Sequence, residues 1–366
     1  MNVKQYPELN EVETQSPELP SVSIVLPLHP FIHMEHSWKH KLKLVHDEIK
    51  QQLSTDYPHE LVTILLKKYD DLIDQIGSPK HRKGVVMYLS PHFEKFFLLD
   101  FTPQEKIVID LSYEIRDIVF NHALRRKALL LLMSANELKY YVYQDGLIEK
   151  VNPRIPLHIE AFMQDKIHPV EQYHEGSRKR ELAMQLFIKN ADDGLTELLS
   201  KYTFDVLVLG VEKLINHFLL YTKNNIHIKD LVTGNYFESS PSELIQLTEQ
   251  SFLKIETKHQ QDLMKIIQKS YNDRVLAIGL KNCWTQVMQE NCKMLIIEKN
   301  FIKEAIQGAD PETIYTDHVN DSQVKMKDAV DDLIEQAIRR GAVVEFVDDG
   351  LLKDYRHVAA VQYFTM

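Results

Sequence analysis

The spacing of apolar residues predicts an alternation of helices and strands, most clearly near the C-terminus. Four apolar residues recur there at helical spacing, namely Val330, Leu333, Ile334 and Ala337. Arg339 and Arg340 then fall in the last turn of this helix, and Gly341 follows as its stop. Apolar runs at 343–347 and 358–364 come next. This order predicts a helix–strand–turn–strand unit that closes a small α/β domain.

The same periodicities predict the elements of the rest of the chain. Strands are predicted over 21–26, 83–89, 93–100, 127–134, 138–144, 204–210, 226–233 and 294–297. Helices are predicted over 38–52, 59–76, 179–202, 212–222, 242–269 and 280–291. Residues 150–178 are predicted to be irregular, and residues 307–325 to form a polar connector. Alternating strands and helices favour a mixed or parallel sheet in the middle of the chain.

At 366 residues the chain is too long for one ordinary core, so several domains are expected. The polar, proline-containing residues 1–20 are predicted to be a disordered lead. An N-terminal α/β domain is predicted over 21–124, a middle domain over 125–257 and a C-terminal α/β domain over 258–366. The predicted fold class is therefore α/β, with three α/β domains.

Composition limits the classes of function. A net charge of -10 argues against general electrostatic coating of nucleic acid, so any RNA contact must use local patches. No apolar run approaches the roughly 20 residues that span a bilayer, and the N-terminus lacks the order of a signal peptide. A cytoplasmic protein without a membrane partner is expected. Two cysteines, Cys283 and Cys292, are too few for a disulfide framework or a four-cysteine zinc site.

Several segments, taken in their order, resemble the bacterial branch of the archaeo-eukaryotic peptide-chain release factor family, which is release-factor-like and Pelota-like. They are residues 22–29, 83–90, 205–210, 275–280 and 294–297, followed by the closing unit described above. Apolar strands that end in glycine or proline are common, so the joint order carries the resemblance. It implies a ribonuclease-H-like middle domain and a last domain related to kink-turn-binding ribosomal proteins.

The resemblance also implies where this chain departs from the family. Peptide release in the family depends on a Gly-Gly-Gln loop before the long helix of the middle domain. Here that segment, 171–180, holds one glycine, and no Gly-Gly-Gln occurs in the sequence. The resemblance therefore implies a ribosome-associated factor that rescues, silences or protects ribosomes at the A site without hydrolysing peptidyl-tRNA. The implied partners are ribosomal RNA and ribosomal protein, with a translational GTPase as a further candidate and no DNA.

A short basic segment is the candidate RNA-binding site, and its residues are Gly176, Ser177, Arg178, Lys179 and Arg180. As a flexible tip it would contact ribosomal RNA phosphates through the three cations. The alternative interpretation is a polar loop and the solvated first turn of a helix. Basic residues oppose the dipole at a helix N-terminus, which favours a reason other than helix stability.

Other clusters receive a structural interpretation. The histidines His29, His33, His36 and His40 have spacing that zinc accepts, but no acid or cysteine completes a site, so no metal is predicted. The basic runs 80–83 and 125–127 are interpreted as solvated loop or strand flank, with phosphate contact as the alternative. Cys283 is interpreted as a core residue.

No catalytic residue and no cofactor is predicted, and a non-enzymatic factor is favoured. One alternative is a divergent hydrolase, either a peptidyl-tRNA hydrolase that uses the same loop or a nuclease. A nuclease needs clustered carboxylates, of which Asp205 and Asp230 are candidates. The remaining alternative is a protein-binding scaffold that does not contact the ribosome.

Overall fold

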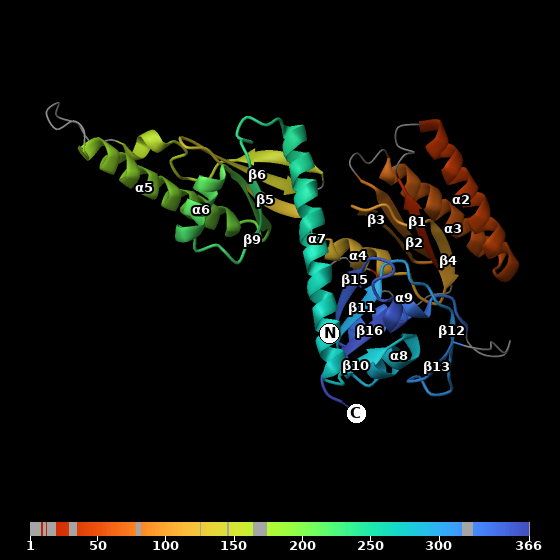
Figure 1. Ribbon diagram of the computed structural model, residues 1–366. Coiled ribbons are helices and arrows are strands. Elements are labelled where there is room, and N and C mark those ends of the chain that lie inside the picture. The colour runs from red at the N-terminus through yellow and green to blue at the C-terminus, as the bar shows by residue number, and fades with distance from the viewer. Residues whose placement is uncertain are drawn as a thin grey trace. The chain divides into compact units, whose positions relative to one another are not determined.

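The computed structural model describes residues 9, 12, 20–28, 35–77, 82–124, 126–144, 146–163, 174–316 and 325–365, apart from the side chains of 35–36 and 174–179. The chain forms two compact units (Figure 1). Unit 1 combines residues 1–125 with residues 259–366, and unit 2 consists of residues 126–258. Both units contain helices packed on sheets, so the predicted α/β fold class is confirmed.

Unit 1 is built from two larger sheets and a small one. Its strands are β1 (Ser21–Pro27), β2 (Gly84–Ser90), β3 (Phe93–Leu99), β4 (Lys106–Asp110), β10 (Leu276–Ile278), β11 (Cys292–Glu298), β12 (Ala305–Gln307), β13 (Ile314–Tyr315), β14 (Lys325–Met326), β15 (Val343–Val347) and β16 (Val358–Gln362). Its helices are α2 (Glu35–Asp56), α3 (His59–Ile76), α4 (Arg116–Ala123), α8 (Leu280–Met288), α9 (Ala329–Arg339) and the 3-10 turn η4 (Lys353–Tyr355).

The first sheet of unit 1 is antiparallel, in the order β3-β2-β1-β4, and it is buried on both faces. Every residue of β2 is buried, as expected for a strand between two layers. Ile24 and Met87 face a core that they share with α2 and α3. Val25 and Tyr88 point the other way, into a core formed with the C-terminal segment.

The second sheet of unit 1 is mixed, in the order β10-β16-β11-β15. The parallel pair β11–β15 carries one face of apolar residues that packs on α8 and α9. The opposite face packs on the C-terminal end of α7 (Pro241–Asn272) through Leu263 and Ile267. Phe120 of α4 meets Phe346 of β15 edge to face, with ring centroids 5.3 Å apart. The two sheets of unit 1 therefore share a continuous hydrophobic core.

Buried charges also join the two segments of unit 1. The guanidinium of Arg116 donates to Asp328 at 2.6 Å, and both side chains are nearly inaccessible to solvent. The amino group of Lys106 in β4 lies 3.0 Å from the carboxyl groups of both Glu114 and Asp117. Tyr88 donates to the backbone carbonyl of Glu114. A buried charge pair contributes little net stability, but the loss of one partner is costly.

Unit 2 is a sheet between two helical layers. Its elements are β5 (Lys127–Met133), β6 (Leu138–Gln144), β7 (Leu147–Val151), the 3-10 turn η3 (Ile159–Phe162), α5 (His174–Leu199), β8 (Asp205–Gly210), α6 (Glu212–Tyr221), β9 (Ile228–Thr233) and the N-terminal part of α7. The strand order is β7-β6-β5-β8-β9, with β5, β8 and β9 parallel and the others antiparallel. Helices α5 and α6 cover one face and α7 covers the other. The expectation of a mixed sheet is confirmed.

Several local predictions are corrected by the structure. Strands β4 and β7 were not predicted, because both are short; β4 has only three consecutive apolar residues between two charged ends, and β7 has charged residues between its apolar ones. The predicted polar connector 307–325 contributes β13 and the first residue of β14 to a small sheet with β12. The predicted helix–strand–turn–strand order of the closing unit is confirmed as α9, β15 and β16, and β11 lies between its two strands in the sheet.

The unit boundaries fall at 125/126 and 258/259. The first and third of the predicted domains lie in the same compact unit and share a core. The division into three domains, and the ribonuclease-H-like and kink-turn-protein-like shapes, stay predictions. The predicted lead, residues 1–20, lies almost wholly outside the described residues.

Candidate RNA-binding surface

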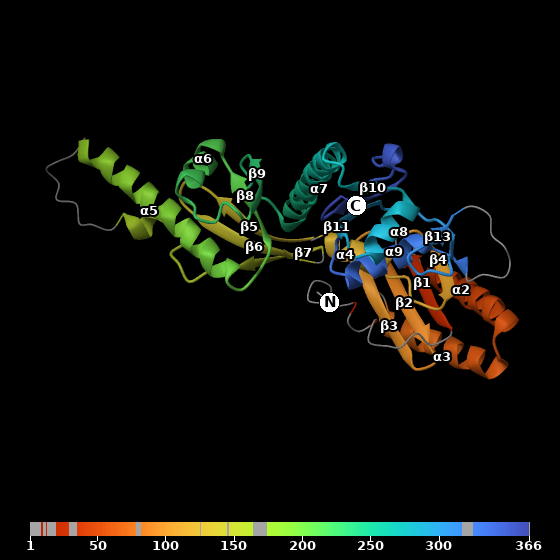
Figure 2. The ribbon, with the colours of Figure 1, turned by 90° about the horizontal axis from the view of Figure 1, so that it is seen from below.

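The predicted basic segment lies at the N-terminal end of the long helix α5. The helix begins at His174, five residues before the predicted start at Lys179, so Gly176–Arg180 has helical backbone instead of the expected loop. In both ribbon views this end of α5 extends past the sheet of unit 2 (Figures 1 and 2). The first buried residue of the helix in the described set is Ala183. We call residues 174–182 the α5 tip.

Side-chain positions within the α5 tip are described from Arg180 onward. Arg180 and Glu181 are exposed, and Leu182 is 57% exposed. One turn further, Leu186 is 42% exposed, whereas Phe187 and Ile188 are buried against the sheet. The side chains of Gly176, Ser177, Arg178 and Lys179 lie outside the described set. The basic segment therefore starts a helix whose packed part begins only at Ala183.

The electrostatics of the α5 tip do not favour a purely structural role. Three consecutive cations, Arg178 to Arg180, lie in the second turn of the helix, next to the turn where the helix dipole disfavours positive charge. Glu175 and Glu181 flank them in the sequence. The free backbone N–H groups of a helix N-terminus suit phosphate oxygens, and cations close by in the sequence add to that preference.

The other basic runs serve packing where they are described. Arg126 donates to Glu249 at 2.9 Å and lies over the ring of Phe252, so it ties β5 to α7 within unit 2. Arg82 forms an ion pair with Asp100. Residues 78–81 and Arg125 lie outside the described residues. The interpretation of these runs as structural is thus supported at Arg126 and Arg82.

Arg340 also has a structural role. Its guanidinium donates to the carbonyl of Gln336 in the last turn of α9, as predicted for a cation at a helix C-terminus. Gly341 follows with a φ of 83°, the left-handed conformation expected at a helix stop.

In the described structure, neither a metal site at the histidine run nor a reactive thiol at Cys283 finds support. His29 and His33 lie outside the described residues, as does the side chain of His36, and His40 is exposed. In the part of the chain that the structure describes, no group of three or more histidine, cysteine, aspartate or glutamate side chains could hold a metal ion. Cys283 is fully buried, and burial raises the pKa of its thiol well above the usual value.

The carboxylates considered for a nuclease lie on the face of the unit 2 sheet that α7 covers. Asp230 of β9 is paired in register with Leu207 of β8, and Asp205 precedes that residue by two positions. Lys254 of α7 lies 3.6 Å from Asp230. Asp230 therefore has a cationic partner, which is a structural reason for its position.

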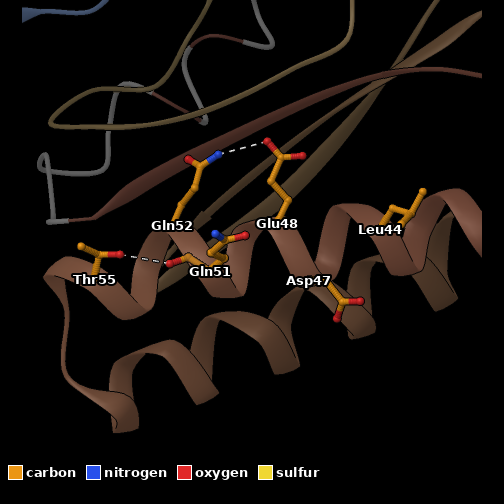
Figure 3. A pocket seen from close by; sticks show the side chains of 6 residues that line it. All are labelled: Leu44, Asp47, Glu48, Gln51, Gln52 and Thr55. Atoms are coloured by element: carbon orange, nitrogen blue, oxygen red, sulfur yellow. Dashed lines mark hydrogen bonds between the residues drawn. The ribbon is translucent and has the colours of Figure 1, made fainter.

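A pocket of about 630 Å³ lies along α2 and is lined only by residues of that helix (Figure 3). Gln52 donates to Glu48 and the hydroxyl of Thr55 donates to the carbonyl of Gln51, both bonds within the helix. Asp47 and Glu48 give the surface a negative charge. A face of one helix with its polar groups bonded internally is an amphipathic outer surface, so we do not regard it as a site.

Among the described helices, none is long and apolar enough to cross a membrane.

Comparison with protein families matches residues 129–291 to the model described as bacterial archaeo-eukaryotic release factor family 3. The matched residues include nearly all of unit 2, with the whole of α5, and continue through α8 in unit 1. A search of curated proteins found no match.

Solved structures that match this chain include three translation proteins. An archaeal translation termination factor, aRF1, is 14% identical over 99% of this chain and 97% of its own, with a TM-score of 0.24. A ribosome-bound archaeal Pelota, whose structure also includes ABCE1, is 12% identical over 77% and 78%, with a TM-score of 0.42. Dom34 of S. cerevisiae, described as termination-like and interacting with Hbs1, is 10% identical over 78% and 74%, with a TM-score of 0.37. Likeness at this level does not bear on function.

Proposed function

The chain belongs, through residues 129–291, to the bacterial archaeo-eukaryotic release factor family, and on this premise we propose that it is a ribosome-associated translation factor. The family match is the observation that carries the proposal. In the proposed function the factor occupies the ribosomal A site and rescues, silences or protects the ribosome. Ribosomal RNA and ribosomal protein are its proposed partners, and a translational GTPase is proposed to deliver it.

The α5 tip is the part of the chain that we propose to contact ribosomal RNA. The chain as a whole is acidic, so its long-range field repels RNA and contacts must be local. Arg178, Lys179 and Arg180 supply charge-assisted hydrogen bonds to phosphate oxygens. The start of the helix extends past the sheet of unit 2, which supports the proposal that this end makes contacts beyond the sheet.

The proposed factor does not release peptide. In the family that this chain resembles, a Gly-Gly-Gln loop helps to place a water molecule on the ester of peptidyl-tRNA. No two glycines are adjacent in this sequence. The backbone at Gly176–Arg180 is helical, and helical backbone is restricted by its hydrogen bonds, unlike a glycine loop. These features support binding without hydrolysis.

The experiment uses the full-length protein and purified bacterial 70S ribosomes that carry a labelled peptidyl-tRNA. Sedimentation through sucrose measures binding, and release of the labelled peptide measures hydrolysis. We expect the protein to sediment with ribosomes and the label to stay on the tRNA. A termination factor with an intact Gly-Gly-Gln serves as the positive control for release.

Each half of the proposal can fail separately. Release of peptide at the rate of the control factor would establish the peptidyl-tRNA hydrolase alternative. Absence of co-sedimentation with vacant and with peptidyl-tRNA-bearing ribosomes would remove the ribosome from the proposal and leave the protein-binding scaffold.

A further inference from the structure

Two apolar side chains of unit 2 are largely exposed where α6 ends and the chain turns into β9. Leu220 is 78% exposed and Ile226 is 77% exposed, whereas the next most exposed large hydrophobic side chain of the described chain is 59% exposed. We propose that residues 220–229, called here the α6–β9 segment, dock onto an apolar segment of a partner protein that also carries carboxylates. The inference does not depend on ribosome binding or on the α5 tip.

Packing within unit 2 does not account for either apolar side chain. The buried face of α6 consists of Leu214, Ile215 and Phe218. Leu220 lies off that face, and Ile226 lies outside both α6 and β9. Single apolar residues are common on protein surfaces, but here the two most exposed ones of the described chain belong to one short segment. Apolar surface that gathers in this way is a feature of sites that bind other molecules.

A buried carboxylate orders the chain between the two apolar side chains. Asp192 of α5 is only 4% exposed. It accepts the hydroxyl of Thr222, the backbone N–H of Lys223 at 3.1 Å and the side-chain amide of Asn224 at 2.8 Å. The backbone N–H of His227 then donates to the carbonyl of Asn224 at 2.9 Å and closes the turn. Because the segment is already ordered, little conformational entropy is lost when a partner binds it.

The charge of this part of the chain indicates an acidic partner. Residues 213–229 contain three lysines, two histidines and no acid, in a chain whose net charge is -10. The ammonium group of Lys229 donates to the carbonyl of Ile226 at 3.0 Å, so this cation is held next to that residue. Lys223, which is exposed, lies between Leu220 and Ile226 in the sequence. Carboxylates beside the apolar surface of the partner would complement these cations.

A protein fits these features better than a lipid surface or an RNA strand. Aliphatic side chains in a fixed arrangement can be packed closely by a protein surface of matching shape. A lipid surface accepts apolar side chains in any arrangement, so it gives no reason for the ordering by Asp192. Bases of single-stranded RNA stack on aromatic rings, and neither of the two exposed side chains is aromatic.

The test selects ligands for the full-length protein from a phage-displayed library of random dodecapeptides. The library offers every combination of apolar, acidic, basic and neutral residues, so the enriched sequences report the chemistry that the protein prefers. We expect enriched peptides that combine large apolar residues with aspartate or glutamate. Fluorescence polarisation then measures the affinity of a labelled consensus peptide for the parent and for each variant.

The variants remove the two apolar contacts and the charge separately. Leu220→Ser and Ile226→Ser should each weaken binding of the peptide about tenfold or more, because burial of such a side chain contributes a factor of this size. Lys223→Gln with Lys229→Gln should weaken binding and reduce its dependence on salt. All four residues are exposed, so the fold is expected to stay intact, which a thermal melt checks. Leu253→Ser is the matched control, because this leucine of α7 is 58% exposed and lies outside the α6–β9 segment.

Vesicles of phosphatidylserine and phosphatidylcholine and a labelled single-stranded RNA test the other occupants. An apolar, carboxylate-bearing peptide whose binding both serine variants weaken, and Leu253→Ser does not, supports the proposal. The proposal is overturned if no peptide is enriched, if the enriched peptides lack carboxylates, or if they bind the variants Leu220→Ser and Ile226→Ser as tightly as the parent. Binding of vesicles or RNA, in place of peptides, that the two serine variants abolish would also overturn it and would assign the segment to that occupant.

Discussion

Asp331 caps the helix that begins at Arg116, although 215 residues separate the two. The carboxylate of Asp331 accepts the backbone N–H of Arg116 at 2.8 Å and that of Ile115 at 3.0 Å. The side chain of Arg116 also binds the C-terminal segment, because it donates to Asp328. The carboxylate of Asp328 in turn caps α9. The N-terminus of α4 is therefore capped by the C-terminal segment of unit 1, and Arg116 of the N-terminal segment binds the side chain that caps α9.

Removal of this cap should destabilise unit 1. In Asp331→Ala, the N–H groups of Ile115 and Arg116 lose their acceptor in a buried environment. Each unsatisfied group costs about 1–3 kcal/mol, so we expect the free energy of unfolding to fall by about 2–4 kcal/mol. Urea denaturation of parent and variant measures the change.

The matched control is Asp354→Ala, which removes an exposed aspartate of the same unit. It should change the free energy of unfolding by less than about 0.5 kcal/mol. Equal stability of Asp331→Ala and the parent would show that the cap contributes nothing.

The acids at this junction predict that stability falls as pH rises. Burial, followed by repulsion from Asp331, raises the pKa of Asp332 to about 8. Burial, again followed by repulsion from Asp331, raises the pKa of Glu114 to about 9. Between roughly pH 4 and these values the folded protein retains protons that the unfolded chain has released. The free energy of unfolding therefore decreases with pH in this window, by up to about 1.4 kcal/mol per pH unit for each such proton.

Asp332→Asn tests this pH dependence, because the amide resembles the protonated acid in shape. We expect the variant to match the parent near pH 5 and to be more stable than the parent at pH 8, so that its stability depends less on pH. Melting temperatures measured from pH 5 to pH 9 report the difference. Asp354→Asn should leave the pH profile of the parent unchanged, and an identical profile for Asp332→Asn would refute the assignment to this carboxyl.

The α5 tip predicts a salt-dependent weakening of ribosome binding on removal of its three cations, Arg178, Lys179 and Arg180. Replacement of all three by Ala should weaken binding and lower the slope of log affinity against log salt by up to about two to three units, near one for each phosphate that is no longer bound. Stability should change little, because the packed part of the helix begins at Ala183. Sedimentation with ribosomes at several salt concentrations gives both quantities.

The control for the α5 tip removes the same charge from another surface of unit 2, through Ala at the exposed residues Lys213, Lys223 and Lys229. It should retain the binding and most of the salt slope of the parent. Parent-like binding of the α5 tip variant at every salt concentration would mean that the tip is only a solvated helix start.

We expect replacement of Gly194 by Ala to lower stability, although Ala in place of a helical glycine normally raises it. Its replacement by Ala would place a Cβ 2.5 Å from Ile155 and 2.7 Å from the hydroxyl of Tyr140. That hydroxyl donates to Ala191 at 2.9 Å and is buried, so it cannot move away without breaking its bond. We expect Gly194→Ala to lower stability by about 1–3 kcal/mol through overpacking, instead of raising it by about 1 kcal/mol.

The partner variant for this prediction is Gly194→Ala combined with Tyr140→Phe, which removes the crowding hydroxyl. Thermal melts should show the double variant less destabilised than the sum of the two single variants. Additive effects would indicate that the two side chains do not collide.

Local elements were predictable where pattern and stop signal agree. The helix 59–76 was predicted with the observed bounds, because its apolar face is regular and a glycine, Gly77, follows it. In the structure Gly77 has the positive φ that suits a helix stop. The start of α5 was placed too late, because Gly176 and the following cations suggest a loop. Strand β7 was missed because an exposed edge strand buries too little surface to show an apolar pattern. The run of positive charge was enough to locate the α5 tip in the sequence. It did not predict that the backbone there is helical.

The sequence by itself determined the amphipathic helices, the buried strands, the acidic balance and the basic run at 178–180, since each depends on neighbours within a few residues. Only the tertiary structure decided that Asp331 caps the helix at Arg116, that β11 separates β15 from β16, and that Asp192 binds the residues that follow α6. These relationships join residues that lie far apart in the chain. Their partners are selected by the topology of the sheets, because a hydrogen bond or a packed ring depends on distance in space and leaves no period in the chain.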